Sequence, residues 1–72
     1  MAFDKAVFAA KLRGKRAEAD ITQDELAKRA GISQASVYQY EDGGALPGAD
    51  KLFALAEALG CTPNDLIGWG AN

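Results

Sequence analysis

The sequence predicts an all-α fold, a compact five-helix bundle. Apolar residues recur at helical spacing, and polar residues that cap helix starts alternate with glycines that end helices. With 72 residues the chain has room for one domain, expected over residues 1–72 with a core at about 4–68 and a tail at 69–72. A domain this small lies near the lower size limit for stability without a disulfide, a metal or a partner subunit.

The first helix is expected over about residues 4–19, because Phe8 and Leu12 share one face of a helix there. Gly14 lies inside it and should cost about 1 kcal/mol relative to alanine. Asp20 follows, and aspartate is one of the few residues other than glycine that tolerate a left-handed backbone. We therefore expect the helix to end at Asp20.

The second and third helices are expected to lie very close together in the chain. Thr22 begins the second, and Glu25 three residues later completes a capping box. Gly31 ends that helix, and Ser33 can cap the next one at once. Because only Gly31 and Ile32 separate the helices, they cannot fold back antiparallel and should cross at a steep angle.

Two further helices are predicted in the second half of the chain. The third helix ends at residues 42–44, and residues 45–48 form a loop. A fourth helix follows over about residues 49–59 with an apolar stripe, and Gly60 stops it. The run TPND at residues 62–65 starts a short fifth helix, with threonine as the cap, proline in the first position and aspartate in the positive first turn.

The numbers of cysteine and histidine residues limit which disulfides and metal sites the chain can form. One cysteine, Cys61, excludes an internal disulfide, and the absence of histidine argues against a zinc site, so we expect no metal and no cofactor. This usage is typical of a reducing, cytoplasmic setting, and no apolar run approaches the roughly 18 residues that span a bilayer. Cys61 is expected to be a small buried filler. Trp69 either packs over the fifth helix or joins a dimer contact.

The charge is unevenly distributed. The net charge is −2, but residues 1–31 carry seven cations and five carboxylates, whereas residues 32–72 carry one cation and five carboxylates. Four of the cations lie in the run KLRGKR at residues 11–16. The chain is therefore polarised, and the distribution of charge is a better guide to a partner than the net charge.

The third helix has two unlike faces. At 100° per residue, Val37, Tyr40 and the stem of Glu41 fall on the side that suits a core. The opposite side is uncharged and consists of Gln34, Ala35, Tyr38 and Gln39. Glutamine can read an adenine edge with two hydrogen bonds, and alanine can touch a thymine methyl group. The alternative is an ordinary solvated polar face.

A longer motif favours the first of these interpretations. It runs Thr22-Gln23-x-x-Leu26-Ala27-x-x-Ala30-Gly31-Ile32-Ser33, followed by Val37 and Tyr40-Glu41-x-Gly43. It resembles the helix-turn-helix of the Cro/C1 repressor family, also called the XRE family. Flanking segments are similar to the family's outer helices: Phe8-x3-Leu12-Arg13-x2-Arg16, Leu52-x2-Leu55-Ala56-x2-Leu59-Gly60 and Asp65-Leu66-Ile67. The resemblance covers roughly residues 6–68. It implies a phage-repressor type of domain that binds DNA.

The resemblance implies a role for particular residues. Base edges should be faced by Gln34, Ala35, Tyr38 and Gln39. The DNA backbone should be contacted by Thr22, Gln23, Ser36, Arg13, Arg16, Lys28 and Gly43, with Gln23 either bonding a phosphate or bracing the third helix. Arg16 and Glu41 should form a partly buried ion pair. The sequence departs from the family at residues 43–50, GGALPGAD, which carry no cation where similar proteins often hold phosphates.

The predicted function is that of a sequence-specific transcriptional regulator, of the repressor type that the family implies, associated with the nucleoid. It should act as a homodimer, through its C-terminal helix region, on an inverted-repeat operator in double-stranded DNA. The alternative is a protein-binding module, for example a partner of a toxin or of another regulator, with little DNA affinity. An enzyme is not expected, because the chain has no histidine and no phosphate-binding glycine loop. A phage repressor, a restriction–modification controller and an antitoxin remain open.

Overall fold

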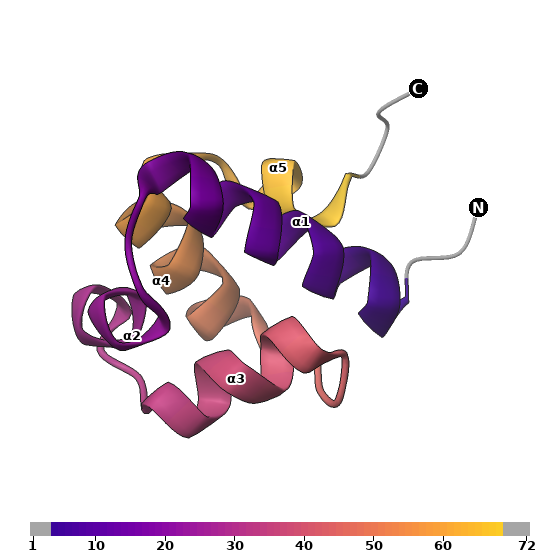
Figure 1. The fold of residues 1–72 in the computed structure, drawn as a ribbon. Coiled ribbons are helices and arrows are strands. Elements are labelled where there is room, and N and C mark those ends of the chain that lie inside the picture. Colours follow the sequence, from indigo (N-terminus) through magenta and orange to yellow (C-terminus); the bar gives the residue numbers. More distant parts are fainter. Residues whose placement is uncertain (1–3, 69–72) are drawn as a thin grey trace.

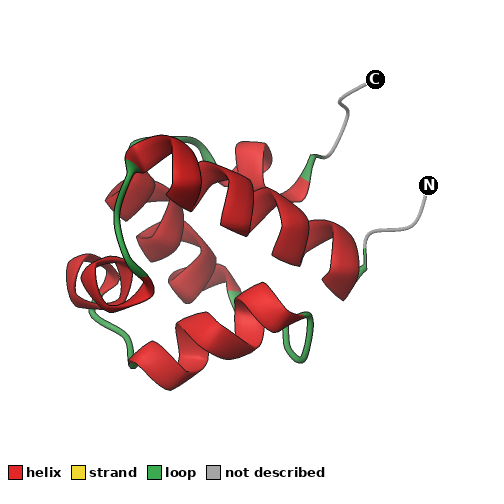
Figure 2. Cartoon of the chain, viewed as in Figure 1, coloured by secondary structure: helices red, strands yellow, loops and turns green. Residues whose placement is uncertain are grey.

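The computed structural model describes residues 4–68, and within that range it contains five α-helices and no strand (Figure 2). The helices are α1 (Lys5–Ala19), α2 (Gln23–Ala30), α3 (Gln34–Asp42), α4 (Ala49–Leu59) and α5 (Pro63–Ile67). The predicted all-α fold is confirmed. The expectations for Trp69 and for the tail at 69–72 lie outside the described residues.

Side-chain caps fix where the helices begin. The Asp4 carboxylate accepts a hydrogen bond from the Val7 amide at 2.8 Å and starts α1. At α2 the Thr22 hydroxyl accepts from the Glu25 amide at 3.0 Å, while the Glu25 carboxylate accepts from the Thr22 amide at 2.8 Å. A second capping box of the same kind begins α5. These bonds satisfy amides that a helix start would otherwise leave without partners.

Asp20 ends α1 in the left-handed conformation that its residue type suggests. Its φ is +57°, and among the described residues it is the one non-glycine with a positive φ. Its amide donates to the Ala17 carbonyl at 3.1 Å, which closes the last turn. The chain can therefore turn into α2 after two further residues.

All five helices contribute to one core. The fully buried large side chains are Phe8, Leu12, Leu26, Leu55, Leu66 and Val37. The rings of Phe8 and Tyr40 meet edge to face, with centroids 6.5 Å apart, and so join α1 to α3. None of the described helices combines the length and the apolar character needed to cross a membrane.

The arrangement of α2 and α3 positions the candidate site. In Figure 1, α2 is seen end on while α3 runs across the view, so the two helices cross steeply, as the short connection predicted. Gly31 ends α2 with a φ of +71°, and the Ile32 amide donates to the Ala27 carbonyl at 3.0 Å. α3 lies at one edge of the bundle, packed on α1 and α2, with its outer side uncovered (Figure 1).

Acid should weaken the domain partly through its capping boxes. The hydrogen bonds from Thr22 lower the pKa of Glu25 below its ordinary value of 4.5, and those from Thr62 lower the pKa of Asp65 below 3.8. A carboxyl whose pKa is lower in the folded state adds stability above its unfolded pKa, and that stability is lost as the pH falls through the folded pKa.

We therefore expect the urea midpoint to fall below about pH 4.5, and to fall less steeply in Glu25→Gln, which has no carboxyl to protonate. Urea unfolding between pH 3 and 7 measures this. Glu18→Gln, an exposed change on α1, is the control and should follow the unmodified chain. Equal acid sensitivity in all three proteins would show that the α2 cap contributes nothing.

Candidate nucleic-acid interface

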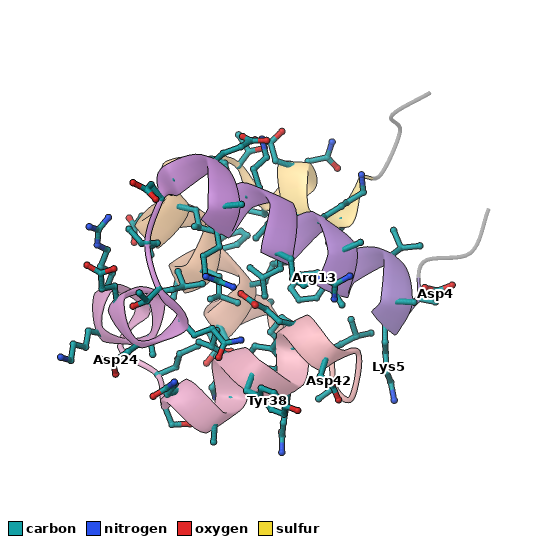
Figure 3. The ribbon with its side chains drawn as sticks, viewed as in Figure 1. Asp4, Lys5, Arg13, Asp24, Tyr38 and Asp42 are labelled. Carbon is teal, nitrogen blue, oxygen red and sulfur yellow. The ribbon has the colours of Figure 1, made fainter. Side chains whose placement is uncertain are left out.

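The outer face of α3 presents four uncharged side chains. They are Gln34, Ala35, Tyr38 and Gln39, all exposed, and Tyr38 is 57% exposed. None of the four side chains forms a hydrogen bond within residues 4–68, so both amides keep their donors and acceptors available. With Gln23 of α2 they line an open depression of about 350 Å³. Tyr38 points away from the bundle in Figure 3.

The inner face of α3 is held by one buried carboxylate. Glu41 is 4% exposed, and it is the one charged side chain buried in the described part of the chain. Its Oε2 accepts from Arg16 Nε at 2.6 Å, and its Oε1 accepts from Arg16 Nη2 and from Gln23 Nε2, each at 3.0 Å. Three helices therefore meet at this carboxylate: α1 through Arg16, α2 through Gln23 and α3 through Glu41 itself.

Arg16 is committed to this network. Besides its bidentate bond to Glu41, its Nη1 donates to the Ile21 carbonyl at 3.0 Å, so it also fixes the α1–α2 connection. The hydrogen bond to Glu41 raises the pKa of Arg16, against a smaller lowering by burial. All three guanidinium nitrogens donate within the protein. The expected ion pair between Arg16 and Glu41 is present. Because each guanidinium nitrogen of Arg16 already donates to Glu41 or Ile21, few of its N–H groups remain for the expected contact with the DNA backbone.

Arg13 lies beside the C-terminal end of α3. Its Nη1 donates to the main-chain carbonyl of Glu41 in the last turn of the helix. α3 has no basic residue of its own in that turn, so Arg13 supplies from α1 the positive charge that the negative end of a helix favours. A depression of about 260 Å³ lies beside it, lined by Arg13, Gln23, Tyr38, Glu41 and Asp42. Arg13, Tyr38 and Asp42 are labelled in Figure 3.

Thr22 and Gly43, both expected to contact the DNA backbone, have main-chain amides that donate within the protein. The Thr22 amide donates to Glu25, and the Gly43 amide closes α3 on the Gln39 carbonyl. Both amides take part in the capping of a helix end, so they are not available to a phosphate. In the part of the chain that the structure describes, the neighbouring amides of Gln23 and Asp24 have no acceptor and offer the alternative at this helix start.

The remaining expected contacts differ in availability. Ser36 is half-buried, and its hydroxyl accepts from the Ser33 hydroxyl at 2.9 Å at the start of α3. Lys28 is 77% exposed and pairs with Asp24 at 3.2 Å. Such an exposed pair contributes little stability and opens readily.

Lys5 was not expected at this face. It is exposed at the start of α1, and Figure 3 shows its side chain extending on the same side of the molecule as Tyr38. Tertiary packing places Lys5 there, because α1 packs on α3 and the start of α1 lies near the end of α3 (Figure 1). In the sequence, only the excess of cations in residues 1–31 could have indicated a role for Lys5 at this face.

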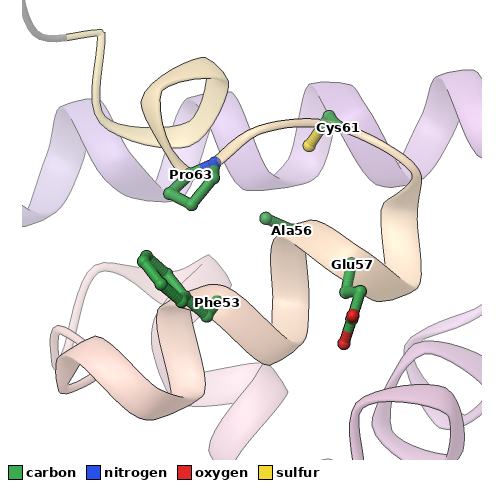
Figure 4. A pocket seen from close by; sticks show the side chains of 5 residues that line it. All are labelled: Phe53, Ala56, Glu57, Cys61 and Pro63. Carbon is green, nitrogen blue, oxygen red and sulfur yellow. The ribbon is translucent and has the colours of Figure 1, made fainter.

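A second surface feature lies on α4 and the loop to α5. Phe53 is 63% exposed, the most exposed large apolar side chain in the described residues. It borders a groove of about 320 Å³ that is also lined by Ala56, Glu57, Cys61 and Pro63 (Figure 4). Cys61 is half-buried rather than fully buried, and burial raises the pKa of its thiol, which keeps it in the weakly nucleophilic protonated form.

Comparison with known proteins agrees with this geometry. Residues 12–66 match the family described as Helix-turn-helix. The chain is 42% identical over 57 residues to the HTH-type transcriptional regulator DicA of Escherichia coli (strain K12), and 33% identical over 57 residues to the repressor protein C2 of Salmonella phage P22. Each alignment covers 79% of this chain but only 42% and 26% of those two proteins, so the chain spans less than half the length of either relative.

Solved structures have the same fold. The restriction–modification controller protein C.AhdI from Aeromonas hydrophila superposes with a TM-score of 0.83 at 27% identity, over 86% of this chain and 94% of that one. The P22 c2 repressor, solved in complex with a synthetic operator, gives a TM-score of 0.80 at 31% identity, over 85% of this chain and 92% of that one.

Proposed function

The chain belongs to the Cro/C1-type (XRE) helix-turn-helix family of repressor-type DNA-binding regulators, and from that premise we propose that it is a sequence-specific transcriptional regulator that binds an inverted-repeat operator as a homodimer. One observation carries the proposal: the outer face of α3 is uncovered and uncharged, and its amides have no partners in the described chain. The protein would act in the cytoplasm on the nucleoid, and this mode of action needs no cofactor and no catalysis.

In this proposal α3 enters the major groove. The groove is about 12 Å wide and admits one helix, so the four outer side chains reach base edges. Contacts to the DNA backbone then set the orientation of the helix. The available donors are the free amides at the start of α2, the remaining N–H groups of Arg13, and the exposed ammonium groups of Lys28 and Lys5.

The Glu41 network has a positioning role in the same proposal. Gln23 lies at the start of α2, which would face a phosphate, and its amide is tied to the carboxylate that holds α3. The phosphate-binding end of α2 and the base-reading face of α3 are thereby fixed relative to each other. We assign Arg16 to this brace, since its nitrogens already donate within the protein.

The dimer is proposed to form through the groove beside Phe53. A two-fold contact would place Phe53 of each copy against the partner's α4–α5 region and bury an apolar side chain that one copy leaves 63% exposed. The described domain measures 32 × 23 × 21 Å. Two such domains side by side can present their α3 helices about 34 Å apart, the spacing of successive major grooves on one side of the duplex.

Selection of bound fragments from random duplex DNA, at near-physiological salt, tests the function. We expect an enriched inverted repeat with half-sites about one helical turn apart. Glu18→Gln, on exposed α1 surface, should enrich the same repeat. Weak binding without enrichment that disappears as salt rises would reject the proposal and favour the protein-binding module.

Replacing Phe53 by serine should weaken the dimer. Burial of a phenylalanine contributes up to about 1.5–3 kcal/mol, and both copies of a two-fold dimer lose one, so the dissociation constant should rise by about 100-fold or more. Sedimentation equilibrium at micromolar concentrations measures the change. Val7→Ser is the matched control, because Val7 is another exposed apolar side chain, on α1. If the unmodified chain stays monomeric even on its operator, the dimer proposal is wrong.

A further inference from the structure

The outer face of α3 has a chemical composition that restricts which bases it can read. Its four side chains form two columns at i, i+4 spacing, Gln34 above Tyr38 and Ala35 above Gln39. They offer two primary amides, one methyl group and one phenol. Three charged residues line the adjoining depression: Arg13 donates to the end of α3, Glu41 is buried in its network, and Asp42 is exposed at the last position of α3, beyond the four reading positions.

The two bases of a G·C pair are read best by charged side chains. Guanine is most often read by arginine or lysine bonding to O6 and N7, and cytosine donates its N4 amino group to glutamate or aspartate. None of these residue types stands on the outer face of α3 at positions 34, 35, 38 or 39. Adenine, in contrast, pairs its N6 and N7 with a glutamine amide, and the thymine methyl packs against alanine.

We propose that the core of each operator half-site is a short run of A·T pairs, with adenine edges read by Gln34 and Gln39 and a thymine methyl read by Ala35. This inference rests on the proposed DNA-binding function. Gln34 and Gln39 are five residues apart, which is about 7.5 Å along a helix. That distance corresponds to about two base-pair steps of about 3.4 Å, so the core contains about three base pairs.

Gln23 is excluded from this reading set although it borders the same depression. Its Nε2 donates to Glu41 at 3.0 Å, so the protein fixes the orientation of its amide. The amides of Gln34 and Gln39 have no such partner within residues 4–68 and can turn to present a donor and an acceptor to one adenine. Base discrimination is therefore assigned to α3 alone.

The test uses the selected operator and modified copies of it. 7-Deazaadenine, which lacks the N7 acceptor, replaces each half-site adenine in turn. At two positions, the adenines assigned to Gln34 and to Gln39, the unmodified chain should lose affinity, by up to about 150-fold at each. Gln34→Ala should lose at least as much on the unmodified operator, bind random duplex as the unmodified chain does, and become insensitive to 7-deazaadenine at one of the two positions. Gln39→Ala should show the same coupling at a second adenine, and Glu18→Gln should behave as the unmodified chain.

Each outcome decides the matter. An A·T core with these two couplings supports the inference. An enriched repeat whose half-site core is G·C would overturn it and leave the proposed function standing. An A·T core at which both glutamine variants keep full sensitivity to 7-deazaadenine would also overturn it, since the sequence would then be read through DNA shape. Absence of any enriched repeat would overturn the inference and the proposed function together.

Discussion

Glu41→Ala is expected to be the most damaging single substitution in the polar network, at a cost of about 3–5 kcal/mol in the free energy of unfolding. The carboxylate is 4% exposed and is bound by Arg16 and Gln23. Its removal leaves a partly buried guanidinium and an amide without their acceptor. Arg16 keeps a quarter of its side-chain surface in water, which places the loss towards the lower end of this range.

Urea unfolding followed by circular dichroism measures this loss. Small domains are typically stable by about 5–15 kcal/mol, and one of this size lies near the lower end, so Glu41→Ala should be substantially unfolded at 37 °C. Asp42→Ala is the matched control, because Asp42 is the adjacent carboxylate but is exposed, and it should change stability by less than about 0.5 kcal/mol. Similar midpoints for the two variants would show that the buried network does not hold the fold together.

Leu55→Ala should destabilise the domain by about 2–5 kcal/mol, because it removes a large core side chain and leaves a cavity. Leu55 of α4 is fully buried, whereas Phe53, two residues earlier on the same helix, is 63% exposed. Phe53→Ala should therefore leave monomer stability within about 0.5 kcal/mol, although Phe53 is the larger side chain.

The comparison is made by urea unfolding at a protein concentration low enough to keep the chain monomeric, so that any dimer contact does not enter. Losses of equal size in Leu55→Ala and Phe53→Ala would mean that the ring of Phe53 packs on the core, and that it does not form an uncovered edge of the groove. The same pair of variants, tested by sedimentation, should rank in the opposite order for self-association of the folded chain.

Features set by local interactions could be predicted from the sequence. The caps at Thr22 and Ser33 and the left-handed turn at Asp20 depend on residues no more than three positions apart, so each helix could be placed closely. The periodicity of α3 likewise separated buried Val37 from exposed Tyr38, because an amphipathic helix at the edge of a bundle has one inner and one outer face.

Features set by tertiary packing could not be predicted in this way. The bond from Arg13 to the end of α3 joins residues 28 positions apart, and no local pattern marks it. The exposure of Phe53 depends on where α5 packs beside α4. The position of Lys5 on the side of Tyr38 depends on how α1 crosses the bundle. The family resemblance named Arg13 for a backbone contact, but the structure was needed to find its partner.

If the outer face of α3 reads DNA as proposed, the Glu41 network separates what the domain recognises from what keeps it folded. Its members hold α3 from behind, and none of the four outer side chains of α3 takes part in it. The four outer residues, which we propose read bases, can therefore diverge by mutation while the Glu41 network is inherited unchanged. A gene duplication could give two regulators with separate operators after very few substitutions, and neither copy would have to pass through an unfolded intermediate on the way.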